Sequence, residues 1–95
     1  MRVTIEVFAY LKDKLGWKSK VVEIDKDSAF LIEILKTVPE LYKELCSDRD
    51  DCIDEDFIIL VNGIHYQFIG GEKAIIRDGD TISIFPPAAG GTIYG

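Results

Sequence analysis

The segment with the most distinctive chemistry lies near the C-terminal end, where residues 78–95 read DGDTISIFPPAAGGTIYG. Residues 81–85 alternate polar and apolar side chains, which predicts a half-buried strand. Pro86 and Pro87 end this strand, because neither can donate a ladder hydrogen bond and both fix φ near an extended value. Residues 88–91 then carry almost no side chains. A backbone with so few side-chain atoms can enter a narrow channel and contact a partner through main-chain hydrogen bonds.

The side chains elsewhere in the chain do not form a catalytic pattern. His65 is the only histidine, so a Ser–His or Cys–His pair would have to use it. It falls in a predicted strand beside a tight turn, which favours a surface or packing role. Cys46 and Cys52 together with one distant histidine do not make a recognisable metal-ligand set. We therefore expect no metal site, no bound cofactor and no active site of the chain's own.

The composition indicates one small globular domain. The chain has 95 residues, of which 47% are hydrophobic, and it carries 17 acidic against 11 basic residues for a net charge of −6. This charge argues against nucleic acid or an anionic membrane as a partner and favours a basic protein surface. The amino terminus alternates polar and apolar residues and has no continuous apolar segment, so we expect neither a signal peptide nor a membrane span, and a cytoplasmic location.

Hydrophobic periodicity predicts the elements of the first half of the chain. They are, in order, a strand over residues 1–8, a short helix over 10–15 ending at Gly16, a strand over 20–24, a main helix over about 29–38 and a further short helix over 40–45. Asp27 or Ser28 is the expected cap of the main helix. Pro39 is expected to break that helix at its end.

The apolar runs and turn residues in the second half of the chain predict strands. Residues 47–56 are strongly acidic and predict a solvated loop, with a patch that steers a basic partner as the alternative. Residues 57–61 predict a buried strand, and residues 64–69 its return strand after the Asn62–Gly63 hairpin turn. With the last strand over 81–85, the whole pattern predicts an α+β fold with a mixed sheet.

The C-terminal motif DGDxIxxFPPxAGG resembles the end of the MoaD/ThiS group of ubiquitin-like sulfur carriers, and most of all MoaD, the small subunit of molybdopterin synthase. The Val61-Asn62-Gly63 turn is similar to a turn of that group, and so are four residues near the amino terminus: Phe8, Ala9, Leu11 and Gly16. The resemblance implies a β-grasp fold, with a mixed sheet packed on one main helix over residues 1–87. It also implies a flexible C-terminal tail over residues 88–95.

The resemblance further implies that a main-chain carboxylate is the reactive group. In this family a separate MoeB/ThiF-like activating enzyme uses ATP to adenylate the Gly-Gly terminus, and a sulfur nucleophile then displaces AMP to leave a thiocarboxylate. The tail next enters the large subunit of molybdopterin synthase and delivers sulfur for molybdenum or tungsten cofactor biosynthesis. Carried over to this chain, Gly91 becomes the thiocarboxylate and Gly90 its neighbour in the channel. The docking segment is then Phe85, Pro86, Pro87, Ala88 and Ala89.

Four residues follow Gly91, and they depart from the family pattern. As long as residues 92–95 are attached, Gly91 has no free carboxylate. We expect a processing protease to remove them, since exposed termini are readily cleaved. Loss of the transfer function, or Gly95 as the working end, are the alternatives.

Two other functions compete with sulfur transfer in molybdopterin synthesis. The chain could be a protein modifier whose tail is joined to lysines of other proteins, which lysine conjugates in cell extracts would reveal. It could also be a binding module whose tail only docks, and replacing Gly91 by Ala would then leave its function nearly unchanged.

Overall fold

The computed structural model describes residues 1–46 and 53–87. Its elements follow in this order: β1 (Arg2–Val7), α1 (Tyr10–Leu15), β2 (Ser19–Glu23), β3 (Ser28–Phe30), α2 (Leu31–Lys36), α3 (Pro39–Leu45), β4 (Ile58–Val61), β5 (Ile64–His65), two 3₁₀ helices (Tyr66–Phe68 and Gly71–Lys73), β6 (Ile75–Arg77) and β7 (Thr81–Phe85). Within this described part, no helix is long and apolar enough to cross a membrane.

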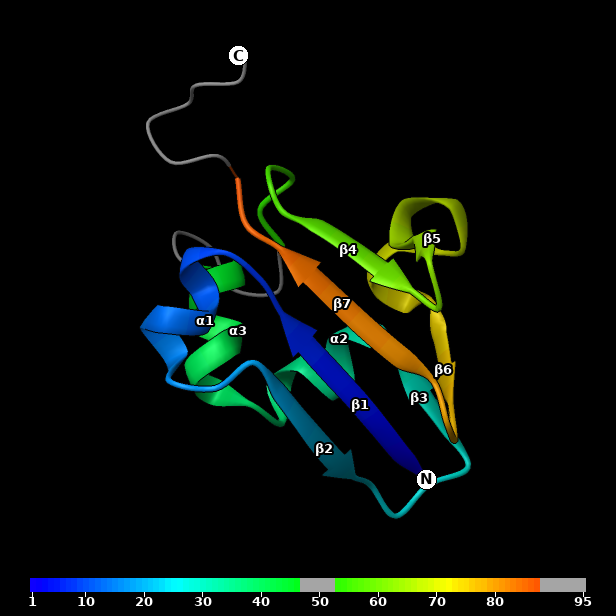
Figure 1. The fold of residues 1–95 in the computed structure, drawn as a ribbon. Helices are drawn as coiled ribbons and strands as arrows, with labels where there is room; N and C mark the ends of the chain where they lie inside the picture. The colour runs from blue at the N-terminus through cyan, green and yellow to red at the C-terminus, as the bar shows by residue number, and fades with distance from the viewer. Residues whose placement is uncertain (47–52, 88–95) are drawn as a thin grey trace.

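A five-stranded mixed sheet, in the order β2-β1-β7-β4-β5, organises the domain (Figure 1). β1 and β7 come from opposite ends of the chain and run parallel side by side, with Ile5 opposite Ile82. β2 pairs with β1, and β4 with β7, both antiparallel. The first and last strands of the chain are therefore neighbours, and β7 is an interior strand of the sheet.

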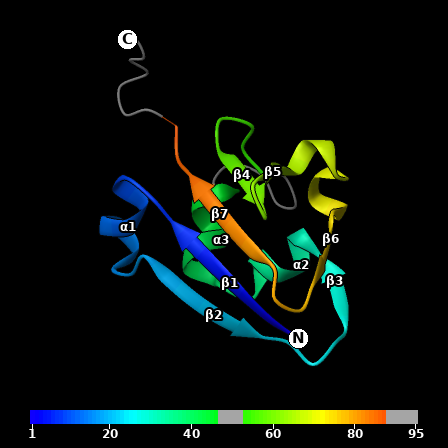
Figure 2. The same ribbon diagram turned by 45° about the vertical axis from the view of Figure 1, so that its right-hand side comes forward.

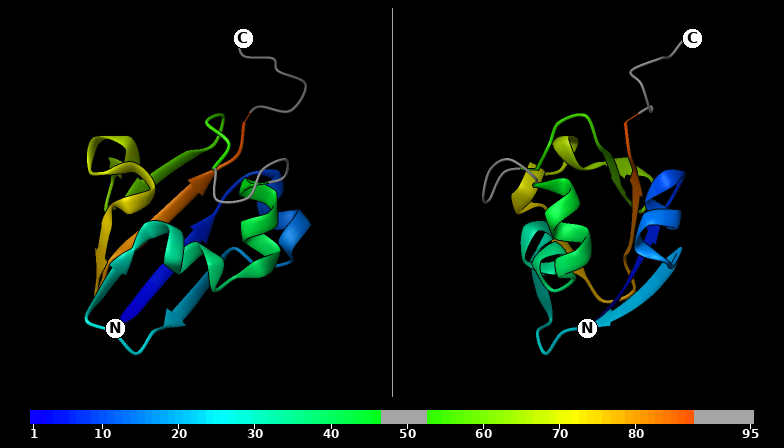
Figure 3. Two further views of the ribbon diagram at one scale, coloured as in Figure 1. Left: turned by 180° about the vertical axis from the view of Figure 1, so that it is seen from behind. Right: turned by 90° about the vertical axis from the view of Figure 1, so that its left-hand side faces the viewer.

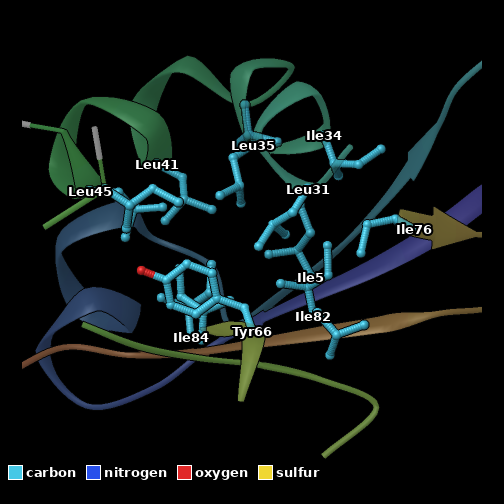
Figure 4. Close-up of a cluster of buried hydrophobic side chains, with 14 of the residues drawn as sticks. Ile5, Leu31, Ile34, Leu35, Leu41, Leu45, Tyr66, Ile76, Ile82 and Ile84 are labelled. Carbon is cyan, nitrogen blue, oxygen red and sulfur yellow. The ribbon is translucent and has the colours of Figure 1, made fainter. Parts of the chain in front are cut away.

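Two short helices, α2 and α3, lie against one face of the sheet, and α1 lies beside the C-terminal end of β1 (Figures 2 and 3). The core forms between these helices and the strands, where apolar side chains alternate inward along β1 and β7. Figure 4 shows ten of its members: Ile5, Leu31, Ile34, Leu35, Leu41, Leu45, Tyr66, Ile76, Ile82 and Ile84. A helical layer packed across a mixed sheet with parallel terminal strands is the β-grasp arrangement that the resemblance implied.

The main helix is shorter than predicted, and its expected start is wrong. Ser28–Phe30 forms β3, which pairs antiparallel with β6 so that Ala29 lies opposite Ile76 and is buried. This pairing outweighs the helix-start signal, because burial in tertiary packing overrides local propensity. α2 begins at Leu31, and the Glu33 carboxylate, rather than Asp27 or Ser28, accepts a hydrogen bond from the Phe30 amide at 2.8 Å.

Pro39 starts a helix in addition to following one. α2 ends at Lys36, and Pro39 is the first residue of α3, a position where its missing N–H costs nothing. The predicted short helix over 40–45 is confirmed, with Leu41 and Leu45 fully buried. The predicted α1 is also confirmed, and Gly16 ends it with a φ of 83°.

The second hairpin agrees with the prediction at its turn but not along its strands. Asn62 and Gly63 have φ values of 52° and 86°, as a tight two-residue turn requires. β4 is buried on one face only, since Ile58 is 47% exposed. The return strand is limited to β5, and a 3₁₀ helix then buries Tyr66 in the core and leaves Phe68 83% exposed.

The predicted acidic loop is described only in part. Residues 47–52 lie outside the described residues, and residues 53–56 form neither helix nor strand. Ile53 is nonetheless buried, and its amide donates to a Glu72 carboxylate oxygen at 2.9 Å. The described end of the acidic stretch is therefore joined to the domain at that residue.

Candidate functional site

The site is built on β7, the strand that leads to the C-terminal motif. β7 lies between β1 and β4, so ladder hydrogen bonds hold it on both edges. In the last two residues of the strand, Ile84 lies opposite both Val7 and Ile59, and Phe85 lies opposite Ile58. The Phe8 amide donates to the Ile84 carbonyl at 3.1 Å, which extends the ladder by one residue. The sheet therefore fixes the backbone up to the residue before Pro86.

The turn before β7 is held by side chains that accept bonds from the backbone. Asp78 Oδ1 accepts from the Arg2 amide at 2.7 Å, and Asp80 Oδ2 accepts from the Arg77 amide at 2.8 Å. Asn62 joins the hairpin turn to this one, because its Nδ2 donates to Asp80 Oδ1 at 2.9 Å and its Oδ1 accepts from the Thr81 amide at 3.0 Å. The two predicted turns, Asn62–Gly63 and Asp78–Asp80, thus act together to fix the start of β7.

Apolar side chains gather where β7 ends. Phe8 and Phe85 stack with ring centroids 4.3 Å apart and planes inclined by 8°. Phe8 is 36% exposed and Ile58, on the other side of Phe85, is 47% exposed. We call Phe8, Phe85 and Ile58 the apolar row. They lie on the face of the sheet away from α2 and α3, since the residues next to them in sequence, Val7, Ile84 and Ile59, are buried.

The predicted docking segment is described only up to Pro87. Phe85 ends β7, and Pro86 and Pro87 follow as half-buried residues outside helix and strand. The remaining predicted site residues, Ala88, Ala89, Gly90 and Gly91, lie outside the described residues, as do residues 92–95. Within the described residues, the geometry of the site is therefore that of Phe85 beside Phe8 and Ile58.

The sequence prediction of the docking segment does not include two members of the apolar row, Phe8 and Ile58. The sequence pattern predicts a packing role for Phe8 and a place in a buried strand for Ile58. The alternation of β1 held the missing signal for Phe8, because it shares its parity with the exposed Arg2 and the half-buried Thr4 and Glu6. For Ile58 no comparable signal exists, since β4 is apolar at all four positions.

The remaining candidate groups have structural roles. His65 Nδ1 accepts from the Gln67 amide at 3.2 Å, and the ring stacks on Tyr66. The histidine therefore caps the 3₁₀ helix, a role that the sequence did not predict, and its stacking agrees with the predicted packing role. In residues 1–46 and 53–87, no three His, Cys, Asp or Glu side chains are grouped so that they could hold a metal ion.

Among the residues that the structure describes, two carboxyl groups have pKa values below their ordinary value of 4.5, and neither belongs to the end of β7. A hydrogen bond from the Phe30 amide, and next one from Lys26, lowers the pKa of Glu33. A hydrogen bond from Lys20 is the main cause of the lowered pKa of Glu40. Both groups hold α2 and α3 to neighbouring segments, so these shifts reflect structure rather than catalysis.

Comparison with known proteins agrees with this geometry. A model described as the ThiS family matches residues 5–91, which include most of the β-grasp domain and the Gly-Gly pair. The chain belongs to the ThiS family. Members of the family are ubiquitin-like sulfur carriers, so the resemblance stated from the C-terminal motif is confirmed.

This ThiS-family chain is similar to three known proteins in sequence, structure or both. Small archaeal modifier protein 3 of Haloferax volcanii is 29% identical over 93 residues, which cover 96% of this chain and all of that protein. The Amycolatopsis orientalis BexX/CysO complex contains a chain that is 29% identical with a TM-score of 0.72, over 94% of this chain and 99% of that one. SAMP1 from Haloferax volcanii has a TM-score of 0.80 at 23% identity, over 96% of this chain and all of that one, and shows the shared fold.

Proposed function

We propose that this ThiS-family protein is a sulfur carrier and the small subunit of a molybdopterin synthase. Its Gly91 carboxylate, freed from residues 92–95 by a processing protease, becomes the thiocarboxylate that supplies sulfur for molybdenum or tungsten cofactor biosynthesis. The protein works in the cytoplasm with two partners, a MoeB/ThiF-like activating enzyme and the synthase large subunit. The chain binds no cofactor, and ATP is used by the activating enzyme.

The observation that supports this proposal is the exit of β7 from the middle of the sheet. An interior strand leads directly into Pro86 and Pro87, and the last strand residue, Phe85, stands in an exposed apolar row. A fixed strand and two prolines reduce the conformational entropy that the segment loses when it is inserted into a channel. The apolar row offers a contact surface beside the point of insertion, so docking and insertion can occur together.

The chemistry requires activation because a free carboxylate is a poor acyl donor. A Gly91 carboxylate oxygen attacks the α-phosphate of ATP, which releases pyrophosphate and forms an acyl adenylate. A sulfur nucleophile then attacks the carbonyl carbon and expels AMP, which leaves the thiocarboxylate. A Cβ at Gly90 or Gly91 would narrow the approach to both reacting centres, and glycine avoids that obstruction.

The mass of the protein isolated from its native cell tests the proposal directly. We expect a chain that ends at Gly91 with one carboxylate oxygen replaced by sulfur. A matched pair of variants separates the possible working ends. Gly91→Ala should abolish support of cofactor synthesis, and Gly95→Ala should leave it unchanged. Endogenous protein that keeps residues 92–95 and still supports cofactor synthesis would refute the proposal.

A second function, modification of other proteins, is favoured by one observation. The relative that this chain matches at 29% identity over its full length is named a small archaeal modifier protein. In that role the activated Gly91 carbonyl is transferred to a lysine amine, which forms an isopeptide bond and releases AMP. Conjugates that carry a Gly-Gly remnant on lysines of other proteins, absent with Gly91→Ala, would support this function. Their absence from cells that contain sulfur-loaded protein would count against it.

A further inference from the structure

The charge of the chain is distributed unevenly around the site. Residues 1–20 hold five of the 11 basic residues but only two of the 17 acidic ones. Two of the four lysines among them, Lys14 and Lys20, form ion pairs with Glu44 and Glu40 at 3.0 and 2.8 Å. Lys12 and Lys18 differ, because neither forms a side-chain hydrogen bond or ion pair within residues 1–46 and 53–87. An acidic protein thus has two uncompensated cations near β1.

These two lysines line the same hollow, beside the apolar row. The hollow has a volume of about 340 Å³, and its walls include Phe8, Ala9, Lys12 and Lys18. Phe8 is also the first member of the apolar row, so the two features are continuous at this residue. α1 carries Lys12 beside the C-terminal end of β1, near the end of β7 (Figure 1). We call this feature the lysine hollow.

The backbone around the lysine hollow is held in place on both sides. The Val7 amide donates to the Lys18 carbonyl at 3.0 Å, and the Lys12 amide donates to the Ala9 carbonyl at 3.2 Å. Ala9 itself has φ 57° and ψ −139°, a conformation that alanine rarely adopts. This strained residue turns the chain from β1 into α1 and so brings Phe8 and Lys12 to one hollow. Strain of this kind persists only where the surrounding structure holds it.

Two carboxylates lie near the lysines without neutralising them. Glu6 lines the lysine hollow, but within residues 1–46 and 53–87 its carboxylate accepts a side-chain hydrogen bond only from Ser83 Oγ, at 3.4 Å on the β7 side. Asp13 lines an adjoining hollow together with both lysines. Neither carboxylate lies within 4.0 Å of a lysine nitrogen, the range in which the pairs of Lys14 and Lys20 are found. The two ammonium groups are therefore available to a partner.

We propose that the lysine hollow is a docking site for carboxylate side chains of the protein that receives the tail. The partner surface would place an apolar side chain against Phe8 and two carboxylates against Lys12 and Lys18. The inference rests on the proposed function in naming this partner, since the hollow adjoins the end of β7. Such a partner can be basic over most of its surface, complementing the net charge of −6, and acidic only at this point.

Charge complementarity favours a protein over a polyanion as the occupant. A nucleic acid or anionic membrane would be repelled at long range by the acidic chain, and two lysines are too few to offset that repulsion. A protein surface can present carboxylates locally. Local pairs of this kind chiefly raise the association rate and fix the orientation of the complex.

Chemical-shift mapping on the isotopically labelled full chain tests the proposal. The probe is a blocked peptide of four glutamates around one phenylalanine, with four lysines in place of the glutamates as the comparison peptide. We expect saturable shifts at Phe8, Lys12 and Lys18 with the acidic peptide and none there with the basic one. The double variant Lys12→Glu/Lys18→Glu should weaken this binding by about tenfold or more, because both ion pairs are lost and like charges face each other instead.

A charge-matched double variant is the control. Lys43→Glu/Lys73→Glu changes net charge equally at two exposed lysines on α3 and the second 3₁₀ helix, so it should leave the binding unchanged. Equal weakening by both double variants, no saturable shift at millimolar peptide, or stronger shifts of the same residues with inorganic phosphate would each overturn the proposal. The titration does not involve Gly91, so an unchanged result with Gly91→Ala separates this inference from the proposed function.

Discussion

The two ends of β7 are built from different interactions. At the start, three side chains, those of Asn62, Asp78 and Asp80, form hydrogen bonds of 2.7 to 3.0 Å with neighbouring amides or with each other. At the other end, stacking of Phe8 on Phe85 is the main side-chain contact, and the neighbouring Ile58 is largely open to solvent. One strand therefore passes from a polar, internally bonded end to an apolar, exposed end over five residues.

The two ends of β7 therefore differ in role. The polar end fixes the position of the strand, and the apolar end offers surface for contact with a partner. Hydrogen bonds at the Asp78–Asp80 turn are directional, so they fix the register of β7 and with it the position of Phe85. Apolar contacts are not directional, and exposed apolar surface is available for burial against a partner. Substitutions at the start of β7 should therefore affect stability, and substitutions at its end should affect partner binding.

The largest effect on folding is expected from Asp80→Ala at the polar end. Loss of the carboxylate leaves the Arg77 amide and Asn62 Nδ2 without their acceptor, and two exposed hydrogen bonds to a charged group are together worth about 2 kcal/mol. The denaturation midpoint should fall without a change in the slope of the transition. Asp27→Ala, at an exposed aspartate between β2 and β3, is the control and should have no comparable effect. An equal loss of stability in both variants would contradict the prediction.

Phe85→Ala, at the apolar end, should weaken partner binding more than it lowers stability. The lost ring stack should lower the free energy of unfolding by about 1 kcal/mol, while binding to the activating enzyme or the large subunit should weaken by about tenfold or more. Calorimetric titration measures the binding, and thermal unfolding measures the stability. Phe68→Ala removes an 83% exposed ring in the 3₁₀ helix that follows the edge strand β5, outside the apolar row, and is the matched control. Equal weakening by both substitutions would mean that the apolar row is not the contact surface.

The polar end of β7 was predictable from sequence, and the apolar end was only partly so. Asp78, Gly79 and Asp80 carry turn chemistry in adjacent residues, and Asn62–Gly63 does the same for the hairpin, so local rules were sufficient. The apolar row combines Phe8, Ile58 and Phe85, which meet only through the parallel pairing of β1 and β7 and the antiparallel pairing of β4 and β7. No local pattern specifies such pairings.

The missed strand β3 has the same cause. Asp25 to Ser28 has the composition of a helix start, and the following residues are compatible with a helix. β3 forms because it pairs with β6, which comes some fifty residues later in the chain. In this pairing Ala29 lies opposite Ile76 and Phe30 lies opposite Ile75. Conversely, α1 was predicted with its boundaries, since its Leu11–Leu15 spacing and the Gly16 stop are both local signals.

A smaller effect is expected at Ala9, where the strained backbone joins the apolar row to the lysine hollow. Ala9→Gly removes the strain at φ 57° but increases the entropy of the unfolded chain, so we expect a net stabilisation below about 1 kcal/mol. Ala9→Val should destabilise the domain, because a β-branched residue fits positive φ poorly. Chemical denaturation of the two variants measures both effects. Destabilisation by glycine as well as by valine would show that Ala9 is not strained.

The smallest effect concerns Glu33, whose carboxylate accepts from a backbone amide in the same way as Asp78 and Asp80 do. The hydrogen bond from the Phe30 amide is the first cause of its lowered pKa, and Lys26, at 3.1 Å, is the second. Because the folded pKa lies below the unfolded one, the stabilisation is complete above the unfolded pKa and is lost as pH falls through the folded value. Titration of the Glu33 carboxyl by NMR should therefore give a midpoint below 4.5.

Lys26→Met separates the two causes of that pKa shift. If the Phe30 amide is the dominant donor, Glu33 should keep most of its lowered pKa when the Lys26 ammonium is removed, and the shift should be insensitive to salt. A return of the midpoint to 4.5 in Lys26→Met would assign the shift to the exposed ion pair instead. In that case Glu33 would not be a backbone anchor of the kind that Asp78 and Asp80 provide at the polar end of β7.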